Sequence, residues 1–427
     1  MPSALRQIAQ ALEGYTPDAL RVDVARQAIA RFVTPLSETE ILPLKQALGR
    51  VLATDLISPI HVPAADNSAM DGYALRGGEL GDCDLTLTIA GKAFAGHPYA
   101  QEVRPGECVR IMTGAVIPRG CDSVIPHELT RNANDQSVTI PAHSILPGSN
   151  RRLAGEDLPA GSVALHRGRL LTPSDLGLIA SLGIGDVPVI RRLRVAFFST
   201  GDELRSIGQP LEEGCVYDSN RYTLQAMLER AGCEPVDLGV VRDDPVSLEA
   251  ALRDGCRRAD MIITTGGVSA GDADYTADMM ARLGDVLFWK IAMRPGRPMA
   301  FGRLHCDGRE TLFFGLPGNP VAVMATFYFF ARDALYLRMG AVPPPMPVLQ
   351  AISAEAIRKR PGRTEYQRGV LSHCADGQTS SVRLTGAQGS GILSSMSEAN
   401  CMVVLDHDSG DIAPGQPVRV IPFHGLI

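Results

Sequence analysis

Short apolar runs alternate with helical patterns in the middle of the chain. Buried strands are predicted at residues 195–198, 236–241 and 261–263, where the runs have the length typical of strands. Between the first two runs, Leu224 and Leu228 fall on one face of a predicted helix. Strands and helices that alternate at this spacing predict a parallel sheet with helices on both faces.

Three predicted helices begin at a proline. Pro173 follows Thr172 and Pro245 follows Asp244, so each pair has an N-cap side chain and a proline at the first helical position. Pro320 suits the same position in a long apolar segment. These prolines therefore indicate where the three helices begin.

The flanking regions have other patterns. An amphipathic helix is predicted over residues 18–33 and a second, short helix over residues 45–48. From about residue 75 to residue 149, short apolar runs are broken by glycine and proline, which predicts a small inserted β domain. Its strands are expected at residues 86–90, 108–112, 123–126 and 138–140.

A proline-rich segment at residues 342–347 predicts a domain boundary. Beyond it, residues 369–372 and 381–384 flank an Ala-Asp-Gly turn and predict a β-hairpin. Two more strands are expected at residues 402–405 and 418–421. The C-terminal region is therefore predicted to be a β domain.

Composition limits the class of protein. Among 427 residues, 45% are hydrophobic and the net charge is -6, which predicts several buried cores and no general nucleic-acid surface. Nine cysteines occur without a C-x-x-C pair, as is typical of a reducing compartment. Neither a secretory signal nor an apolar run of membrane-spanning length is seen, so a cytoplasmic location without membrane contact is expected.

Residues that could bind a ligand follow the predicted strands at their carboxyl ends, which is where open α/β sheets bind ligands. Glu203 and Asp243 follow two of the strands, and Gly266-Gly267 follows the third. Glycines let the backbone approach a ligand closely, and free N–H groups at a helix start can bind phosphate. This edge is therefore a candidate phosphate site.

Acidic residues follow the glycines closely. Asp272 and Asp274 would repel phosphate unless a cation lay between, and Mg2+ would bridge carboxylate and phosphate oxygens. The alternative is that the aspartates only cap a helix. Asp272 keeps that interpretation, as part of the turn.

Three cations lie in or directly after a strand predicted at residues 288–293. Lys290, Arg294 and Arg297 lie close together, and Pro295 and Pro298 limit the flexibility of this segment. Arginine binds oxyanions in bidentate geometry and lysine as a point charge, so a multiply charged anion is expected here. After the strand predicted at residues 312–316, Pro317-Gly318-Asn319 precedes Pro320 and offers backbone donors to a ligand.

Five motifs now resemble those of one family. They are DNSAMDGYA (66–74), IMTGA (111–115), STGDEL (199–204), GGVSAGDADY (266–275) and GLPGNPV (315–321). In this order they resemble the MoeA-type molybdopterin molybdenumtransferases, which include the E domain of gephyrin. The resemblance covers the chain from about Val22 to Pro422.

The resemblance implies an α/β and β multidomain fold and a homodimer. It implies an N-terminal domain in two segments (1–57 and 150–189), an inserted β domain (58–149), a doubly wound MogA-like α/β domain (190–340) and a C-terminal β domain (346–427). The implied reaction is Mg2+-dependent insertion of molybdate into adenylylated molybdopterin, with release of AMP. Transient contacts with the molybdopterin adenylyltransferase and with acceptors of the molybdenum cofactor are also implied.

Matching the family's motifs assigns roles to residues of this chain. The catalytic set is Asp71, Thr113, Asp274 and Lys290. The substrate-binding set is Arg152, Asp157, Gly266, Gly267, Ser269, Arg294, Arg297, Pro317, Gly318, Asn319, Arg363 and Ser390. The metal set is Glu203, Asp243 and Asp274.

Two departures from the family pattern fall on the expected molybdate side. The family usually reads K-P-G-K where this chain has Arg294-Pro295-Gly296-Arg297, and it usually has serine where this chain has Ala322. The choice between molybdate and tungstate is therefore left open. Two other functions also stay open, adenylylation of molybdopterin and a non-catalytic dimeric scaffold.

One prediction follows from the order of these motifs. Asp71 and Asp274 belong to different predicted domains, so one site is expected to form where two subunits meet. We expect a mixture of Asp71→Asn and Asp274→Asn subunits to recover part of the activity that each variant alone lacks. AMP release by the mixture, compared with each variant at the same total concentration, measures this. A mixture no more active than its components would contradict the shared site.

Overall fold

The computed structural model describes residues 3–267, 279–373 and 380–424. Contacts between residues divide the chain into two compact units. Unit 1 contains Met1–Glu40, Gly49–Val51 and Val189–Ile427, and unit 2 contains Ile41–Leu48 and Leu52–Pro188. The chain passes between the units within β1 (Thr39–Pro43) and β11 (Asp186–Ile190). The four domain boundaries expected from the sequence stay a prediction.

A six-stranded sheet forms the centre of unit 1. Its strands, in spatial order, are β15 (Glu234–Val241), β12 (Arg194–Thr200), β16 (Met261–Thr265), β20 (Arg309–Leu316), β19 (Pro298–Cys306) and β17 (Gly284–Lys290). The first four are parallel, but β19 is antiparallel to both β20 and β17. The predicted parallel pairing of these strands is confirmed, and β19, which the sequence did not indicate, adds two antiparallel pairings to the sheet.

This strand order places the candidate residues along one edge. Two successive antiparallel pairings give β17 the same direction as β20. Lys290, at the end of β17, therefore lies at the same edge of the sheet as the ends of the parallel strands. Because β15 and β17 are the two outer strands, five strand spacings of about 4.8 Å each separate their ends. The acidic and cationic candidates thus occupy opposite ends of one edge.

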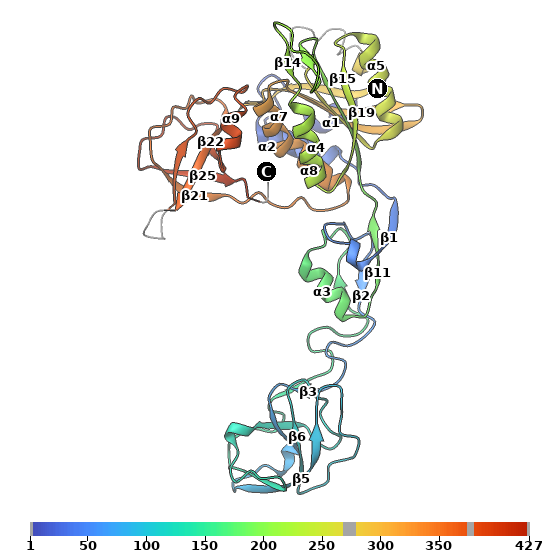
Figure 1. The fold of residues 1–427 in the computed structure, drawn as a ribbon, viewed down its shortest axis with the longest axis vertical. Helices are drawn as coiled ribbons and strands as arrows, with labels where there is room; N and C mark the ends of the chain where they lie inside the picture. Colours follow the sequence, from blue (N-terminus) through green and yellow to red (C-terminus); the bar gives the residue numbers. More distant parts are fainter. Residues whose placement is uncertain (1–2, 268–278, 374–379, 425–427) are drawn as a thin grey trace. The chain divides into compact units, whose positions relative to one another are not determined.

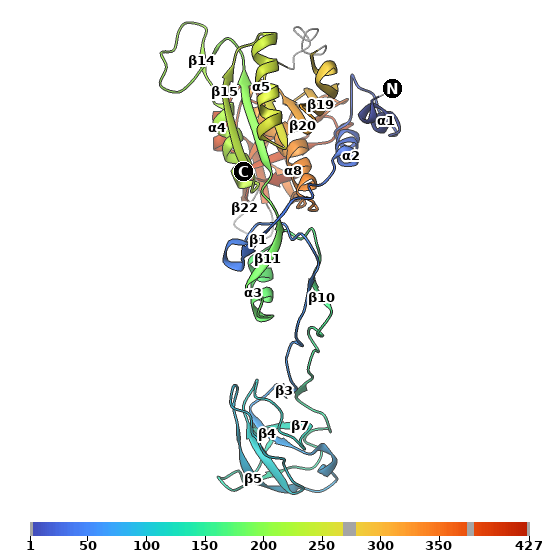
Figure 2. The same ribbon diagram turned by 90° about the vertical axis from the view of Figure 1, so that its right-hand side faces the viewer.

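Helices cover both faces of this sheet. Figures 1 and 2 show α4 (Asn220–Arg230) and α5 (Pro245–Arg258) on opposite sides of it. Asp244 caps α5 by accepting hydrogen bonds from the N–H groups of Val246 and Ser247, as predicted. A long apolar segment begins at Pro320 and contains α7 (Pro320–Thr326), η4 (Phe327–Ala331) and α8 (Arg332–Arg338). Within the described chain, no helix is long and apolar enough to span a membrane.

The first residues also belong to unit 1. They form α1 (Ala4–Gln10) and α2 (Val22–Phe32), so the helix predicted over 18–33 begins four residues late. The reason is backbone pairing: Lys290 N–H donates to the Pro17 carbonyl, and Leu20 N–H donates to the Lys290 carbonyl. Residues 17–20 are therefore extended along the end of β17.

The C-terminal region is a closed β-barrel. Its strands are β21 (Leu349–Ser353), β22 (Thr364–His373), β23 (Ser380–Leu384), β24 (Cys401–Leu405) and β25 (Pro417–Pro422), with the short α9 (Ser394–Glu398). Pairing of β22 with β24 closes the sheet. The predicted hairpin of β22 and β23 is confirmed, and its turn at 375–377 lies outside the described residues. The two-residue strand β18 (Met293–Arg294) pairs with β22.

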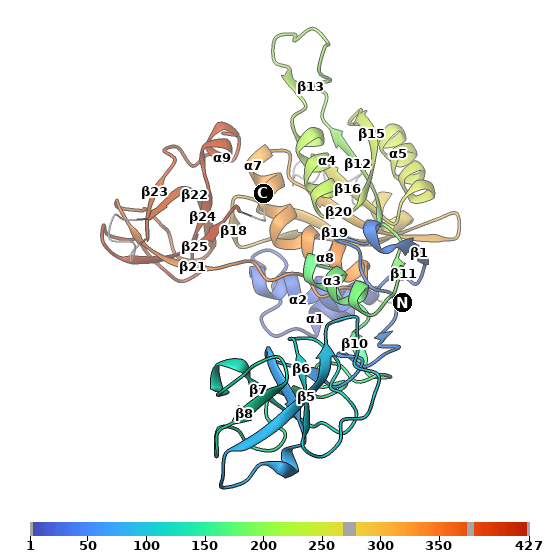
Figure 3. The same cartoon turned by 60° about the horizontal axis from the view of Figure 1, so that its bottom comes forward.

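Unit 2 contains a five-stranded sheet, which Figure 3 shows with β5 in front. Its spatial order is β7 (Ser123–Pro126), β4 (Gly72–Leu75), β6 (Glu107–Ile111), β5 (Leu85–Ala93) and β8 (Ser137–Ile140). Four of these strands are those predicted. Shorter pairs are β2 (Leu56–Ile57) with β10 (Val163–Leu165) and β3 (Asn67–Ser68) with β9 (Arg151–Arg152).

The two helices predicted for unit 2 have different outcomes. Thr172 caps α3 (Pro173–Ser181) in a reciprocal capping box with Asp175, so this predicted start is confirmed. The helix predicted over 45–48 is wrong in length, because η1 (Leu44–Gln46) is a single 3-10 turn. In unit 1, the segment between β12 and α4 contains a short parallel pair, β13 (Leu204–Arg205) and β14 (Val216–Tyr217), and Figure 3 labels β13 in it.

Candidate functional site

A cavity of about 650 Å³ lies in unit 1 between the carboxyl edge of the six-stranded sheet and the C-terminal barrel. This volume is within the usual range of small-molecule sites. Most of the wall comes from four segments, residues 291–298, 317–319, 362–363 and 388–390. The predicted residues that line it are Arg294, Arg297, Pro317, Gly318, Asn319, Arg363 and Ser390.

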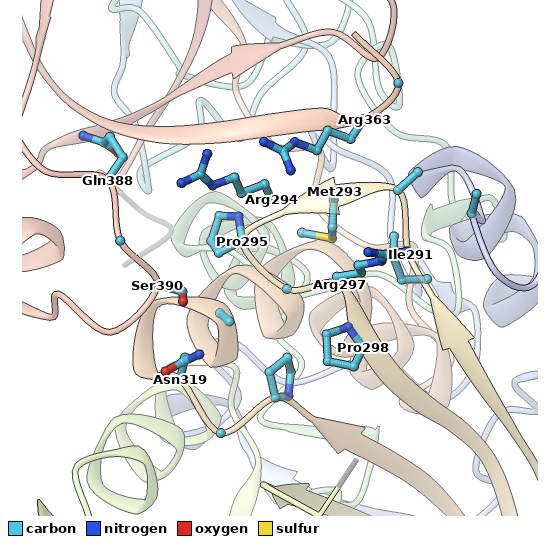
Figure 4. Close-up of a pocket in the computed structure, with 18 of the residues that line it drawn as sticks. Ile291, Met293, Arg294, Pro295, Arg297, Pro298, Asn319, Arg363, Gln388 and Ser390 are labelled. Carbon is cyan, nitrogen blue, oxygen red and sulfur yellow. The ribbon is translucent and has the colours of Figure 1, made fainter. Parts of the chain in front are cut away.

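Backbone pairing explains why the arginines meet. In the ladder of β18 and β22, Arg294 is the partner of Glu365, two residues beyond Arg363. Figure 4 shows the side chains of Arg294 and Arg363 close together, with Gln388, Ser390 and Asn319 following one another along the left of the cavity. Two regions far apart in the sequence thus contribute cations to the same wall.

The cavity has an excess of positive charge. Arg363 Nε lies 2.9 Å from Oε1 of Glu365, a buried carboxylate that compensates its charge. Arg294 and Arg297 are exposed, and neither guanidinium has a hydrogen bond or ion pair with another described residue. Two guanidinium groups therefore remain available to an anion, and charge-assisted hydrogen bonds from arginine are strong.

Lys290 lies beside the cavity rather than in its wall. Its Nζ is 2.8 Å from Oδ1 of Asp18, which does line the cavity. The hydrogen bond and charge of Lys290, helped by Arg297, lower the pKa of Asp18 below its usual value. Sequence reasoning missed Asp18, because its place depends on the pairing of residues 17–20 with β17.

The opposite wall joins the start of α7 to the C-terminal barrel. Val321 N–H donates to the Ser390 carbonyl at 3.0 Å, and Asn220 Nδ2 donates to the Gly318 carbonyl at 2.7 Å. Ala322, where the family usually has serine, also lines the cavity. Both departures from the family pattern therefore lie in the same cavity.

The glycine turn lies next to this wall. Gly266 has φ +87 and Gly267 has φ +67, and a Cβ on Gly266 would lie 2.3 Å from the Thr200 carbonyl oxygen. Glycine is required there, since a side chain would meet backbone and adopt an unfavourable φ. A Cβ on Gly318 would be 3.8 Å from Gly266 Cα, so the two predicted glycine segments are neighbours.

A series of hydrogen bonds between buried polar side chains holds the end of the strand that precedes the glycine turn. Thr265 Oγ1 donates to Ser199 Oγ at 3.0 Å, and Ser199 Oγ donates to Oδ1 of Asp218 at 2.9 Å. Asp218 is 2% exposed and lies 3.4 Å from Arg221. Sequence reasoning missed Asp218. Its available signal was the polar run Asp-Ser-Asn at the start of a helix.

The predicted metal ligands are only partly described. Glu203 and Asp243 follow β12 and β15, and the ladder pairs Thr200 with Val241 at the ends of these strands. Both carboxylates therefore start from neighbouring positions at the sheet edge. Asp274 and Ser269 lie outside the described residues. In the described ranges, no group of three His, Cys, Asp or Glu side chains is placed to hold a metal ion.

Oxygen donors at this edge nevertheless suit Mg2+. Magnesium at phosphate sites commonly uses one or two carboxylates, with water and phosphate oxygens completing its shell. Gly201 leaves room for the Glu203 carboxylate, because a Cβ there would lie 2.6 Å from Oε2. The donor type thus fits such an ion.

The remaining predicted residues lie in unit 2. Asp71 Oδ1 accepts hydrogen bonds from both N–H and Oγ1 of Thr113, each at 2.7 Å. These two bonds, the side-chain bond first, lower the pKa of Asp71 below its usual value. Arg152 lies in β9 opposite Asn67, and Asp157 N–H donates to the Val62 carbonyl. Asp71 and Thr113 are therefore brought together as a pair.

Comparison with known proteins covers nearly the whole chain. A family model described as the MoeA N-terminal region (domain I and II) matches residues 20–183, and one described as the MoeA C-terminal region (domain IV) matches residues 350–423. A protein of Haemophilus influenzae named molybdopterin molybdenumtransferase is 42% identical over 96% of this chain and 100% of its own length. The chain belongs to the MoeA family.

Other members of the MoeA family agree. Residues 196–336 match a model described as a probable molybdopterin binding domain. Molybdopterin molybdenumtransferase 2 of Mycobacterium tuberculosis is 37% identical over 89% of this chain and 94% of its own length. The crystal structure of the molybdopterin biosynthesis MoeA protein from Pyrococcus horikoshii has a TM-score of 0.80 and 28% identity, covering 95% of this chain and 100% of that chain.

These findings confirm three predictions. The family resemblance is correct, and the fold is the expected MoeA-like one, with a MogA-like α/β domain and a β-barrel at the C-terminal end. The curated MoeA relatives carry the name of a transferase, so the prediction of a transferase is also confirmed. The roles of individual residues stay predictions.

Proposed function

We propose that this protein is a molybdopterin molybdenumtransferase that inserts molybdate into adenylylated molybdopterin and releases AMP. The observation that carries the proposal is the cationic cavity of unit 1, with Arg294 and Arg297 unpaired, beside the glycine turn at the same sheet edge. A cationic pocket suits a small dianion, and glycine-turn N–H groups suit phosphate. The two together fit an oxyanion and a phosphate-bearing pterin.

Different residues of the chain would then bind the oxyanion and the phosphate-bearing substrate. Arg294, Arg297 and Arg363 bind the oxyanion and stabilise negative charge that develops as the phosphoanhydride bond breaks. The segment 317–319 and the glycine turn hold the phosphate-bearing substrate at a fixed distance from that oxyanion. Fixing two reactants in this way removes much of the entropic barrier to their reaction.

Magnesium is part of the proposal. Glu203, Asp243 and Asp274 would hold it, and when bound it would offset the charge of the pyrophosphate. The pair of Asp71 and Thr113 is proposed to act on the same substrate. The two hydrogen bonds lower the pKa of Asp71 further below neutral, so the ionised carboxylate is proposed to act as a hydrogen-bond acceptor or base and not as an acid.

The working form proposed is a cytoplasmic homodimer. Its proposed partners are the molybdopterin adenylyltransferase, which supplies the adenylylated substrate, and the enzymes that accept the finished cofactor. The names of the MoeA relatives support molybdopterin as the substrate class.

AMP release from adenylylated molybdopterin tests the proposal. We expect release that depends on both molybdate and Mg2+, measured by chromatography of AMP with each component omitted in turn. Release that ignores molybdate would contradict the insertion step. Incubation of molybdopterin with ATP and Mg2+ is the companion assay. Transfer of AMP to molybdopterin there would support an adenylyltransferase in place of the insertase.

A further inference from the structure

A buried arginine stands behind the wall of the cavity. Arg368 lies in β22 and is 1% exposed. Its guanidinium donates to the carbonyl oxygens of Ala387 (3.4 Å), Gln388 (3.3 Å) and Gly389 (2.9 Å), and its Nε donates to Ser395 Oγ at 3.0 Å. Three successive carbonyls therefore turn toward one side chain.

The backbone of Arg368 holds the same segment. Its N–H donates to Oε1 of Gln388 at 2.8 Å, and Nε2 of Gln388 donates back to the Arg368 carbonyl at 3.1 Å. Gln388, Gly389 and Ser390 form one wall of the cavity. Main chain and side chain of a single residue thus fix the position of that wall.

No carboxylate compensates the charge of Arg368 among the described residues. Burial, and then repulsion from Arg294, lower its pKa to about 10, so the guanidinium is still charged at neutral pH. Removing a cation from water costs several kcal/mol, and carbonyl dipoles offset only part of that cost. A bound anion on the other side of the wall would supply the missing negative charge.

Arg368 differs from Arg363 and Lys290 in having no acidic partner among the described residues. Arg363, five residues earlier in the chain, has the buried carboxylate of Glu365 at 2.9 Å. Lys290 has Asp18 at 2.8 Å. Arg368 is buried more deeply than either, yet it has carbonyl and hydroxyl partners alone. A purely structural buried cation would be expected to have an acidic partner.

We propose that Arg368 is a positioning residue of the oxyanion site, which fixes the wall at residues 388–390 and keeps an uncompensated positive charge behind it. The inference rests on the proposed function. It extends that function to a residue that does not line the cavity and that the sequence motifs did not single out.

The test compares Arg368→Gln with Arg368→Lys in the AMP-release assay. For Arg368→Gln we expect the KM for molybdate to rise about 10- to 100-fold, the range for one lost charge-assisted interaction. The KM for adenylylated molybdopterin and kcat at saturating molybdate should change less than about threefold. Arg368→Lys keeps the charge without the planar fork, so it should recover part of the loss in KM.

Salt dependence separates charge from shape. Loss of a cation should weaken the dependence of the molybdate KM on ionic strength in Arg368→Gln but not in Arg368→Lys. Ser395→Ala keeps the charge and removes one hydrogen bond, so its molybdate KM should rise less than about 10-fold. If Arg368→Gln does not fold, the Arg368→Lys and Ser395→Ala pair carries the test through the same molybdate KM.

The experiment distinguishes failure of the proposed function from failure of the inference about Arg368. Wild-type AMP release that does not respond to molybdate would overturn the proposed function. A molybdate-dependent wild type whose Arg368→Gln variant keeps the same molybdate KM would overturn this inference alone. Equal losses for molybdate and for the pterin, with a lower melting temperature, would likewise overturn it, since they indicate a purely structural role.

Discussion

Replacing Arg294 and Arg297 together by glutamine is expected to raise the molybdate KM by about 100-fold or more. Each loses a charge-assisted interaction of about 1.5 kcal/mol or more with the oxyanion. Neither guanidinium has a hydrogen bond or ion pair with another described residue, so the loss should appear mainly in ligand binding and not in stability. The measurement is AMP release against molybdate concentration, with thermal unfolding as the check on folding.

The matched control is the double lysine variant, which keeps both positive charges but lacks the planar guanidinium groups. Arg294→Lys with Arg297→Lys gives the residues usual in the family and should keep the molybdate KM within about 10-fold of wild type, because lysine still binds as a point charge. Repeating the titration with tungstate shows whether the arginines alter oxyanion choice. A double glutamine variant with unchanged KM for both oxyanions would place the oxyanion elsewhere.

Local patterns predicted the parts of the fold that depend on neighbours in the chain. The cap at Asp244 and the capping box at Thr172 were correct because both involve residues within one helical turn. The position of β19 was missed. Its sequence has Gly302 and Arg303 among apolar residues. Nothing in that pattern shows that the chain reverses direction between β17 and β19 and again between β19 and β20.

In the candidate site, too, residues close together in the chain were predicted, and residues brought in by distant segments were missed. The sequence brought Arg294 and Arg297 together because they are three residues apart, and the resemblance added Arg363 and Ser390. Asp18 could not be predicted, since residues 17–20 reach the cavity by pairing with Lys290, which is 272 residues beyond Asp18 in the chain. Arg368 was missed for a similar reason: its importance comes from burial and from the absence of a nearby carboxylate among the described residues, which only three-dimensional contacts reveal.

The opposite edge of the same sheet depends on a partly buried ion pair. Arg191 donates to both carboxylate oxygens of Asp260 at 2.7 Å, and Arg194 N–H donates to Oδ2 at 2.9 Å. The two side chains are 20% and 14% exposed. Arg191 also pairs with Glu38. This cluster ties the starts of β12 and β16, two inner strands of the sheet, to the N-terminal segment.

Asp260→Asn is expected to lower the free energy of unfolding of this sheet by about 3 kcal/mol. This is the lower end of the range for breaking a buried pair, because both side chains keep some exposure. Trp289, the one tryptophan of the sequence, is buried in β17 of the same sheet, so its fluorescence during urea unfolding reports on this region. The control is Glu234→Gln, which breaks a half-exposed pair with Arg194 and should cost less than about 1 kcal/mol.

The pH dependence of this difference has a definite sign. Burial alone would raise the pKa of Asp260, but the bonds from Arg191 and Arg194 outweigh it and the net shift is downward. A lowered folded-state pKa contributes stability that is fully present above the unfolded value of about 3.9 and is lost as pH falls through the folded value. The gap between wild type and Asp260→Asn should therefore be constant from pH 8 to about pH 5 and shrink in stronger acid. A gap that widens as pH falls would contradict an ionised Asp260 in the folded protein.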